Sequence, residues 1–578
     1  MENVNIKING REYSVPANST VLEAARYAGI DIPTLCYLKD VNEIGACRLC
    51  LVEVTGARGL VTACVYPVNE GMEVFTNTPR VLAARKTNLE LVLSNHEKKC
   101  LSCIRSTTCE LQKLANEYGC DETHFRGESV RYELDQSTPF LVRDNNKCIL
   151  CRRCIGACKN MQDIGVIGAT DRGFDTHIGV AFERKLTETS CIACGQCVVA
   201  CPVGALYEKD DTQKVLDAIG DPTKHVAVCV APSVRATLGE CFGYEPGTDV
   251  EGKMVAAMKR LGFNGVYDMN LTADLTIMEE ATEFLGRVKN GGTLPMMTSC
   301  SPGWIKYCEH YFPEFTENLS TCKSPQQMFG AMYKTYYAEK NGLDPKDIVF
   351  VSAVPCSSKK FEVQRDHQNA AGVPDVDIAI TTRELARLIE RAGINFKGLA
   401  DEKFDVPFDI GSGAGVIFGA TGGVMEAALR TAAEVILGKK LEKLEFEEVR
   451  GIAGIKFANY TLGDMTVRVA VASGTKNAKE LLNKVKSGEV EVDFIEIMAC
   501  PGGCVNGGGQ PVQSAKVRST VNLRELRASV LYNADKKMDL RKSHENSAVK
   551  KLYDEYLGEP NSHKAHEILH TSYVKRGL

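Results

Sequence analysis

The decisive stretch of this sequence reads Glu496-Ile-Met-Ala-Cys500-Pro-Gly-Gly-Cys504-Val-Asn-Gly-Gly-Gly-Gln-Pro511. Two cysteines flank a Pro-Gly-Gly turn, and three consecutive glycines follow shortly after the second cysteine. Thiolates are soft metal ligands, and glycine lets the backbone approach a bulky inorganic group closely. The stretch therefore predicts a seat for a metal cluster, with a CxxxC redox loop of some other enzyme as the alternative.

The composition limits the class of protein. The 578 residues exceed what one hydrophobic core supports, so we expect about three to five domains. A net charge of −5 gives no reason to expect a nucleic acid or an anionic membrane as a partner. The first residues lack a secretory signal, and no apolar run reaches the roughly 18 residues that span a bilayer. We therefore expect a cytoplasmic protein without membrane insertion.

The 24 cysteines are the most unusual feature of the composition. Sixteen of them precede residue 202, in tight and regular groups. In a long chain without an export signal, such groups favour metal ligation over disulfides. We therefore expect several metal clusters in the first 210 residues.

The first group of cysteines follows a predicted hairpin and helix. Residues 3–15 alternate polar and apolar side chains around Asn9-Gly10, which predicts a β-hairpin, and a capping box at Thr20 and Glu23 predicts a helix to about Ala28. With the C-x10-C-x2-C-x13-C spacing, this order resembles a plant-type [2Fe-2S] ferredoxin domain of β-grasp fold over residues 1–78. A zinc site is the alternative. The expected ligands are Cys36, Cys47, Cys50 and Cys64.

A second group combines one imidazole with three thiolates after a helix expected near residues 80–95. Four such ligands can close one cluster or zinc site. The group resembles the His-ligated [4Fe-4S] module of large hydrogenases and of NADH-dehydrogenase-type subunits, here over residues 79–125. Zinc, or a merely structural histidine, is the alternative. The expected ligands are His96, Cys100, Cys103 and Cys109.

Residues 138–210 contain two copies of the pattern C-x2-C-x2-C-x3-C. This repeat is the signature of α+β bacterial ferredoxins with two [4Fe-4S] clusters, in which the fourth cysteine of each run ligates the other cluster. The expected ligand sets are Cys148, Cys151 and Cys154 with Cys201, and Cys191, Cys194 and Cys197 with Cys158.

From about residue 220 the chain alternates apolar runs with amphipathic ones. The runs 225–230, 348–354, 376–381 and 467–472 predict buried strands, and 250–260 and 382–391 predict helices. This alternation favours an α/β domain over residues 220–578, with parallel-sheet lobes flanked by helices.

Three loops of this α/β region resemble the signatures of the [FeFe]-hydrogenases. They are Thr298-Ser-Cys300-Ser301-Pro-Gly-Trp304, Val354-Pro-Cys356-Ser-Ser-Lys359-Lys-Phe-Glu362 and the decisive stretch itself. With the modules before it, the resemblance covers nearly the whole chain, in the order of the large clostridial-type enzymes. It implies an H-cluster, which is a [4Fe-4S] cubane joined through one cysteine to a diiron unit with CO, CN and a dithiolate bridge.

The resemblance also implies roles for individual residues. Cys356, Cys500 and Cys504 would hold the cubane, and Cys504 would bridge to the diiron unit. Charge-assisted hydrogen bonds to cyanide are strongest in a dry site. The residues implied to contact the cyanides are Lys359, Pro232 and Ser233, and those implied to line the cavity are Pro325, Gln326, Phe418 and Met498.

The loop at residue 300 departs from the family pattern, Thr-Ser-Cys-Cys-Pro-x-Trp. Cys300 stands where the family has its proton-relaying cysteine, but Ser301 stands where it has the fourth cubane ligand. Either Ser301 binds iron through oxygen, or Cys300 becomes the ligand and the relay passes elsewhere. A hard oxygen donor should shift the potential of the cubane.

Proton delivery needs titratable groups within hydrogen-bond reach of one another. The resemblance implies a relay through Cys300, Glu280, Ser320 and Glu283, although a solvated acidic helix face is the alternative for the two glutamates. Three histidines near the C-terminus, His563, His566 and His570, have no thiol nearby and are expected to be surface or packing residues.

The implied activity is 2 H⁺ + 2 e⁻ ⇌ H₂, with accessory iron–sulfur clusters carrying the electrons. No glycine fingerprint for NAD or flavin occurs in a strand-to-helix setting, so we expect neither on this chain. The resemblance favours the catalytic subunit of an NAD-linked, electron-bifurcating complex with flavin-binding and iron–sulfur partner subunits. The alternatives are a stand-alone ferredoxin-dependent hydrogenase and an H₂-sensing protein without turnover.

Overall fold

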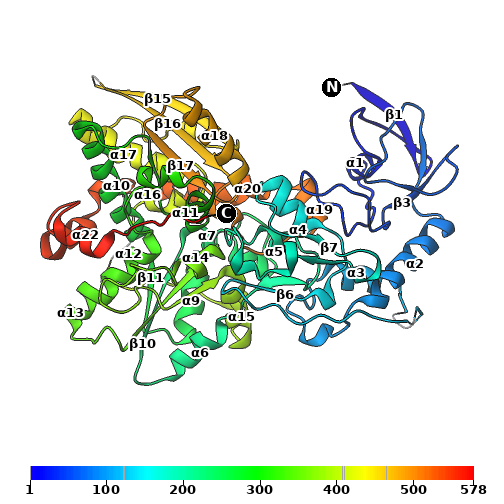
Figure 1. Cartoon of the computed structure of the whole chain (residues 1–578), viewed down its shortest axis with the longest axis horizontal. Coiled ribbons are helices and arrows are strands. Elements are labelled where there is room, and N and C mark those ends of the chain that lie inside the picture. The colour runs from blue at the N-terminus through cyan, green and yellow to red at the C-terminus, as the bar shows by residue number, and fades with distance from the viewer. Residues whose placement is uncertain are drawn as a thin grey trace. The chain divides into compact units, whose positions relative to one another are not determined.

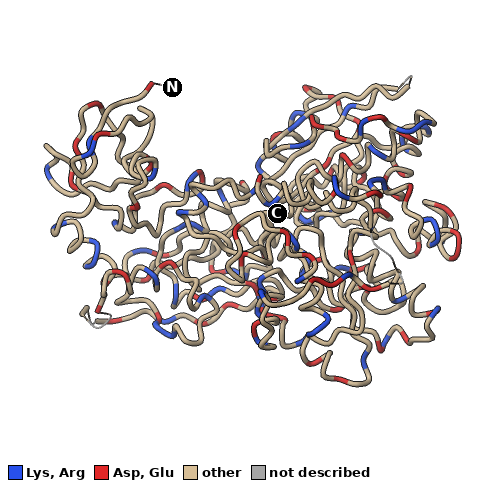
Figure 2. Tube along the Cα trace, turned by 180° about the vertical axis from the view of Figure 1, so that it is seen from behind, with Lys and Arg blue, Asp and Glu red and all other residues tan. Residues whose placement is uncertain are grey.

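The computed structural model describes residues 2–121, 124–125, 127–406, 408, 411–463 and 465–577. The chain divides into two compact units (Figure 1). Unit 1 comprises Met1–Glu188, Gln196–Tyr207 and Val512–Asn522, and unit 2 comprises Thr189–Gly195, Glu208–Pro511 and Leu523–Leu578. Acidic and basic residues are interspersed along the trace (Figure 2).

Unit 1 begins with the expected hairpin. Asn9 and Gly10 have φ angles of 50° and 81°, the left-handed pair that a tight hairpin turn requires. The capping box of Thr20 and Glu23 starts helix α1, which buries one face against the sheet. The sheet has the order β2-β1-β5-β3-β4, and β1 pairs with β5 in parallel. The elements are β1 (Asn3–Ile8), β2 (Arg11–Pro16), α1 (Val21–Tyr27), β3 (Leu51–Val54), β4 (Val61–Thr62) and β5 (Glu73–Phe75).

The rest of unit 1 consists of short elements between the cysteine groups. The longest is the helix α2, whose side-chain cap at Thr78 and proline at its first position explain where it begins. The main elements are α2 (Pro79–Asn95), α3 (Glu110–Glu117), β6 (Leu141–Arg143), α4 (Arg153–Gly156), β7 (Gly168–Thr170), β8 (His177–Gly179), α5 (Gln196–Ala200) and α19 (Ala515–Thr520).

Unit 2 contains two four-stranded sheets. The first has the order β11-β10-β13-β14, and all its strands are parallel. The second has the order β12-β17-β16-β15, with only the β15–β16 pair antiparallel. The strands are β10 (His225–Val230), β11 (Gly265–Asp268), β12 (Met296–Met297), β13 (Ile348–Val354), β14 (Ile378–Thr381), β15 (Ile455–Leu462), β16 (Met465–Ser473) and β17 (Phe494–Met498).

Helix α10 (Asn270–Asn290) joins the two hydrophobic cores of unit 2. Leu271 and Leu275 pack into the core of the first sheet, whereas Ala273, Ile277 and Phe284 pack into that of the second. The other helices that position the site are α7 (Pro232–Arg235), α9 (Glu251–Leu261), α11 (Pro302–Tyr311), α12 (Pro325–Met332), α14 (Ser358–Glu362), α15 (Thr382–Arg391), α17 (Gly423–Leu437), α20 (Leu523–Lys537) and α22 (His563–Leu569). Among the described residues, none of the helices combines the length and apolarity needed to cross a membrane.

Candidate functional site

Four signature loops of unit 2 leave the carboxyl ends of parallel strands. Ala231-Pro232-Ser233 follows β10, Cys356 follows β13 after Pro355, and Cys500 follows β17. The loop with Cys300 follows β12. β10 and β13 belong to the first sheet, and β12 and β17 belong to the second. Because the carboxyl ends of parallel strands meet at one edge of a sheet, each sheet gathers two of these loops from distant parts of the sequence.

The loops line one cavity of about 70 Å³. Most of its lining is apolar, and the polar groups and thiols come from the signature loops. Every residue that the sequence assigned to the cubane or to the cavity lies in this lining: Pro232, Ser233, Cys300, Ser301, Pro325, Gln326, Cys356, Lys359, Phe418, Met498, Cys500 and Cys504.

Glycines bring the backbone close to the thiols. A Cβ atom at Gly503, whose φ is 95°, would lie 2.6 Å from the Thr421 nitrogen, so only glycine fits there. Burial raises the pKa of Cys504 to about 12, and the charge of Lys359 opposes this rise. A thiol in such a place becomes a thiolate when it binds a metal cation.

One buried hydroxyl tests whether the cavity suits a polar bound group. The Oγ atom of Ser233 is buried and has no hydrogen-bond partner among the described residues, yet Ser233 lines the cavity. Buried hydroxyls are normally paired, so this one is available to a group in the cavity. The Ser233 hydroxyl and the three thiols together fit a cluster that carries hydrogen-bond acceptors such as cyanide.

Lys359 is held by a residue to which the sequence gave no role. Its Nζ atom donates to Glu362 Oε2 at 2.8 Å and to the Cys300 carbonyl at 3.2 Å. Glu362 also accepts from Ser324 Oγ and Gln326 Nε2, both at 3.0 Å. Glu362 thus anchors several residues at one wall of the cavity. The three-residue spacing of Lys359 and Glu362 on one helix was the available signal.

Cys300 and Ser301 have different surroundings. Burial, and then the charge of Glu280, raise the pKa of the Cys300 thiol well above its usual value. The Ser301 hydroxyl accepts from the Ala499 nitrogen at 3.3 Å, beside Cys500. Cys300 is therefore coupled to Glu280, whereas Ser301 adjoins the cysteines of the decisive stretch.

The two glutamates of α10 lie in a mostly buried chain of polar groups. Glu280 is fully buried and accepts from Ser299 Oγ at 3.3 Å. Burial, followed by the charge of Glu283, raises the pKa of Glu280 to about 8. Ser320 Oγ donates to Glu283 Oε2 at 2.9 Å. The chain thus runs from the cavity toward Glu283, and the alternative of a solvated acidic face fails for the fully buried Glu280.

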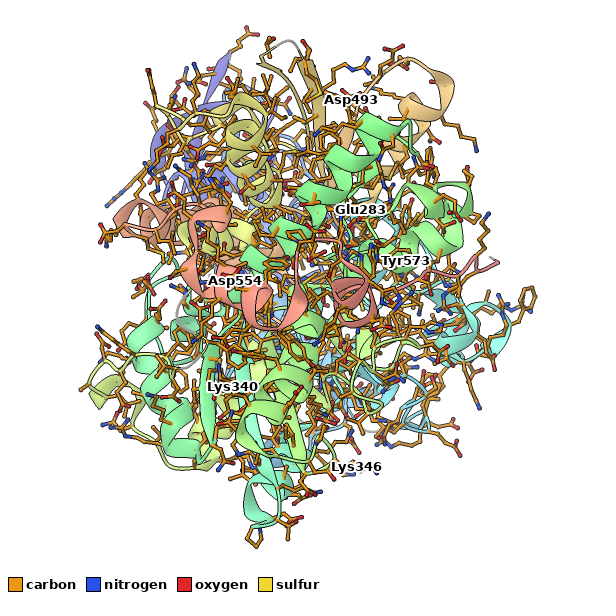
Figure 3. All side chains as sticks on the ribbon, turned by 90° about the vertical axis from the view of Figure 1, so that its left-hand side faces the viewer. Glu283, Lys340, Lys346, Asp493, Asp554 and Tyr573 are labelled. Carbon is orange, nitrogen blue, oxygen red and sulfur yellow. The ribbon has the colours of Figure 1, made fainter. Side chains whose placement is uncertain are left out.

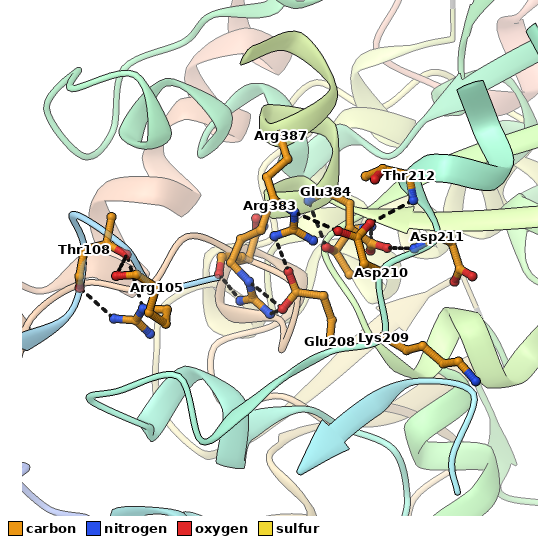
Figure 4. A network of polar contacts seen from close by, with 12 residues as sticks. Arg105, Thr108, Glu208, Lys209, Asp210, Asp211, Thr212, Arg383, Glu384 and Arg387 are labelled. Carbon is orange, nitrogen blue, oxygen red and sulfur yellow. Dashed lines mark hydrogen bonds and ion pairs between the residues drawn. The ribbon is translucent and has the colours of Figure 1, made fainter. Parts of the chain in front are cut away.

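Arg383, at the start of α15, holds the glycine segment that follows Cys504. It donates to the carbonyl oxygens of Gly508 at 2.9 Å and Gln510 at 2.5 Å. Its guanidinium also pairs with Glu208 at 2.7 Å, in a largely buried network with Arg387 (Figure 4). The two arginines outweigh the effect of burial and hold the pKa of Glu208 well below its usual range.

The cysteine groups of unit 1 also gather. Cys36 and Cys47 exchange backbone-to-sulfur hydrogen bonds of 3.4 Å, and Cys50 is hydrogen-bonded to Cys64. A further cavity is lined by the first expected ferredoxin ligand set, Cys148, Cys151, Cys154 and Cys201.

The structure gives fewer contacts within the two remaining expected ligand sets. Among the described residues, the buried Nδ1 atom of His96 has no hydrogen-bond partner. Burial raises the pKa of the Cys109 thiol, and the charge of Cys103 adds to this rise. Cys158 and Cys197 belong to unit 1, whereas Cys191 and Cys194 belong to unit 2, so that ligand set stays a prediction.

Five segments of the chain match known families. Residues 224–508 match the C-terminal domain of the iron-only hydrogenase large subunit, and residues 521–576 match the iron hydrogenase small subunit. The preceding matches are a 2Fe-2S cluster-binding domain at 1–79, the iron–sulfur region of NADH-ubiquinone oxidoreductase G at 85–124, and the ferredoxin-like domain of NADH-quinone oxidoreductase subunit 3 at 138–207.

Individual proteins agree with these matches. The chain is 49% identical to the NADP-reducing hydrogenase subunit HndD of Solidesulfovibrio fructosivorans over the full length of both. It is 44% identical to iron hydrogenase 1 of Clostridium pasteurianum, over 99% of this chain and 100% of that protein. A solved variant of [FeFe]-hydrogenase HydA1 from Chlamydomonas reinhardtii matches with a TM-score of 0.58 at 44% identity, over 64% of this chain and 100% of that one. The chain therefore belongs to the iron-only, or [FeFe]-, hydrogenase family and is an oxidoreductase that acts on H₂.

Proposed function

We propose that this chain is the catalytic subunit of a multimeric, NAD(P)-linked hydrogenase that interconverts protons, electrons and H₂. The observation that carries the proposal is the single cavity on which the loops with Cys356, Cys500 and Cys504 converge. In this proposal the cofactors are one H-cluster, one [2Fe-2S] cluster and three accessory [4Fe-4S] clusters. When bound, the H-cluster supplies a Lewis-acidic iron and a basic bridge for the cleavage of H₂.

Within the cavity, the chain's own residues would hold and orient this group. Cys356, Cys500 and Cys504, with Ser301 at the fourth corner, would ligate the cubane, and Cys504 would bridge to the diiron unit. Ser233 Oγ and Lys359 would donate hydrogen bonds to cyanide. The ion pair of Lys359 with Glu362 fixes the position of the ammonium group before any ligand arrives.

Proton transfer would use the polar chain that leaves the cavity. Cys300 lines the cavity and is coupled electrostatically to Glu280. Glu280 is protonated below about pH 8, and its carboxyl can therefore both give and accept a proton near neutral pH. Ser320 and Glu283 would carry the proton onward.

Electrons would enter through the cluster that Cys191 and Cys194 help to hold. The carbonyl of Ala193, between these cysteines, accepts from Ser357 Oγ at 2.9 Å and from Ser358 Oγ at 3.1 Å. A Cβ atom at Gly508 would lie 2.1 Å from the Cys194 carbonyl oxygen. The loop thus packs directly against both the Cys356 and the Cys504 segments, which supports a short electron path.

The domain boundaries belong to the same proposal. We assign a β-grasp [2Fe-2S] domain to 1–78, the His-Cys₃ module to 79–125, the two-cluster ferredoxin domain to 138–210 and the catalytic domain to 220–578. The parallel pairing of β1 with β5 beneath α1 supports the first assignment. The family match at 1–79 also supports it, and the matches at 85–124, 138–207 and 224–508 support the other three.

The partners are proposed from the similarity to HndD, whose name describes an NADP-reducing hydrogenase subunit. Flavin-binding and iron–sulfur partner subunits would carry electrons between this chain and the nicotinamide. Co-purification of a flavoprotein, with NAD(P)H-dependent H₂ evolution only in its presence, is expected. Full activity of the pure chain with ferredoxin alone would favour the stand-alone enzyme instead.

Replacement of Cys504 tests the catalytic assignment. After maturation with the diiron unit, Cys504→Ala should lose the infrared bands of CO and CN together with H₂ evolution from a reduced viologen. The control is Cys308→Ala, because Cys308 is buried in α11 outside the cavity lining. H₂ turnover that survives in Cys504→Ala contradicts the proposal. A wild-type chain with CO and CN bands but without turnover would indicate the H₂-sensing alternative.

A further inference from the structure

The three histidines near the C-terminus are not equivalent in the structure. The sequence gave them all a surface or packing role. His563 is highly exposed on α22 and pairs with Glu567, and His566 is exposed one turn later. His570, just after the helix, is only 8% exposed, and both of its ring nitrogens have polar partners.

Glu279 fixes the orientation of the His570 ring. The Nε2 atom of His570 lies 3.0 Å from Glu279 Oε2, and the Nδ1 atom lies 2.7 Å from Thr321 Oγ1. Glu279 also accepts hydrogen bonds from Tyr553 OH at 2.5 Å and from the Asn561 nitrogen at 2.8 Å. A carboxylate among donors accepts from Nε2–H, which leaves Nδ1 of the neutral ring as a proton acceptor on the Thr321 side.

The same ring lies beside Glu283. One carboxylate oxygen of Glu283, the Cys322 sulfur and one ring nitrogen of His570 all lie within 4.8 Å of one another. Thr321 donates its backbone N–H to Glu283 at 3.1 Å, while its hydroxyl contacts His570. One hydroxyl or one water molecule is enough to connect Glu283 with the imidazole.

The other neighbours of Glu283 exchange protons poorly near neutral pH. Arg287 pairs with it at 2.6 Å, but a guanidinium keeps its charge throughout this range. Burial and the charges of nearby glutamates raise the pKa of the Cys322 thiol well above its usual value. Ser320 and Thr321 can pass a proton but cannot store one. Among the described partners of Glu283, His570 is the side chain whose type changes charge between about pH 5 and 8.

An exposed histidine lies next to His570. The rings of His566 and His570 have centroids 3.9 Å apart and planes tilted by 35°, and His566 is exposed. Tyr573, labelled with Glu283 in Figure 3, donates to the Ser320 carbonyl at 2.5 Å and fastens the segment after His570 to the relay.

We propose that His570 loads and unloads protons at Glu283, as a second terminus of the relay, with Glu279 as its orienting partner. In H₂ production, the Nδ1–H bond of the imidazolium breaks and an O–H bond forms on Glu283, with Thr321 or one water passing the proton between them. A proton from solvent then restores the Nδ1–H bond. In H₂ oxidation the proton moves in the opposite direction. The inference rests on the proposed relay through Glu283.

The charge state of His570 depends on all titratable groups that face it or its partner Glu283. Three of these groups lie on α10: Glu279, Glu283 and Arg287. The others are Cys322 shortly before α12, Tyr553, His566 on α22, and Tyr573. Glutamine at position 570 can keep hydrogen bonds to Glu279 and Thr321 but cannot titrate.

The test compares His570→Gln with His563→Gln, a matched control on the exposed end of α22. For His570→Gln, H₂ production should fall about 3- to 10-fold relative to wild type at pH 6, and the loss should shrink as pH rises. H₂ oxidation should show the opposite trend, because it needs a neutral ring. The control should match wild type in both directions. An equal loss in both directions at every pH, or no loss at all, overturns the inference.

A second measurement is independent of turnover. In the chain without the diiron unit, the ¹⁵N resonances of labelled histidine should show that Glu283→Gln shifts the titration of His570 but not that of His563. An unchanged His570 titration overturns the inference. If Glu283→Gln retains full hydrogenase activity, the relay itself fails, and that outcome is distinct from a failure at His570 alone.

Discussion

Glu280 has an unusual carboxyl group, because it is fully buried and no cation contacts it among the residues that the structure describes. Its Oε1 atom accepts one hydrogen bond from Ser299, and its Oε2 atom has no partner among the described residues. Burial, and then the charge of Glu283, raise its pKa to about 8. A structural carboxylate would be paired, so this environment suits a group that changes its protonation state during turnover.

The raised pKa of Glu280 predicts a pH dependence of stability. In the unfolded chain the group loses its proton near pH 4.5, but in the folded chain it keeps the proton until about pH 8. The folded state therefore binds more protons in this interval, and the free energy of unfolding falls as pH rises through it, by on the order of a few kcal/mol. Glu280→Gln cannot ionise and should escape this loss.

The measurement is the apparent unfolding midpoint of wild type and Glu280→Gln at pH 5 and pH 8.5. The advantage of the variant should grow with pH. Glu489→Gln serves as the control, because Glu489 is exposed, and its difference from wild type should not change with pH. A constant difference between Glu280→Gln and wild type would refute the assigned pKa.

Ser301 and Cys300 allow a second prediction about single residues. Ser301 adjoins Cys500 through the Ala499 nitrogen, whereas Cys300 is coupled to Glu280. We expect Ser301→Ala to weaken the cubane and Ser301→Cys to retain it with a shifted reduction potential. Cys300→Ala should keep the cubane but lose H₂ turnover by about 100-fold or more, as expected for a missing proton donor. Iron content and electron paramagnetic resonance of the chain without the diiron unit measure the first effect. Loss of the cubane in Cys300→Ala would instead make Cys300 the ligand.

At the scale of elements, the first turn of α15 supports the segment after Cys504. A Cβ atom at Gly509 would lie 2.8 Å from Thr381 Cβ, so the glycine allows the helix start to pack against the loop. Thr381 and Glu384 form a capping box, and Glu384 also accepts from Lys360 Nζ at 2.7 Å. Arg383 completes the contact with its bonds to two loop carbonyls.

Removing Arg383 should therefore affect both stability and cluster retention. Arg383→Ala removes one of the two arginines that pair with Glu208 and the donor to two loop carbonyl oxygens, which should cost about 1–3 kcal/mol. The control is Arg391→Ala in the last turn of the same helix, where an exposed arginine donates to Thr212 and Gln213. Its effect should stay within about 0.5 kcal/mol. Chemical unfolding and iron content measure the two effects, and equal losses in both variants would contradict this role.

The elements that bear the signatures were accessible to sequence reasoning, because they depend on local patterns. The apolar runs predicted β10, β13 and β16, and the capping box predicted α1. The apolar run that begins at Val376 forms a strand only from Ile378 onward. Just before the strand, the Asp377 carboxylate accepts hydrogen bonds from Lys334 Nζ and the Phe350 nitrogen. Such contacts join residues far apart in the sequence, and periodicity carries no information about them.

The same limit explains which residues of the candidate site could be predicted from the sequence. The thiols and Ser233 were found because they stand in short motifs. The pair of Glu279 with His570 joins residues 291 positions apart, and each residue alone has an ordinary structural meaning. Arg383 was also missed, because its role depends on the carbonyls that the fold brings to it.

At the scale of the whole molecule, the cysteine-rich parts of the chain bury fewer apolar side chains than the cysteine-poor parts. Unit 2 has two extended cores built on its parallel sheets. The described residues within 85–124 bury few apolar side chains, chiefly Leu89, Leu93, Leu111 and Leu114, and the charged residues Arg85, Glu90 and Arg105 are buried there too. A segment of this size cannot stabilise itself by hydrophobic burial alone, so we infer that metal ligation supplies much of its folding energy.

Loss of one ligand in this segment should therefore unfold it locally. Cys103 packs against the backbone of Gly204, where a Cβ atom would lie 2.5 Å from its sulfur. Cys103→Ala should lose one cluster and open new proteolytic cleavage sites within about residues 96–120, because a local region without its metal falls to the low end of the stability range. Cys120→Ala is the matched control, since this partly exposed cysteine lies in the same segment but outside the predicted ligand set. Limited proteolysis with mass spectrometry should show cleavage only in Cys103→Ala, with unit 2 intact in both. Protection of the segment in Cys103→Ala would mean that its few leucines suffice to fold it.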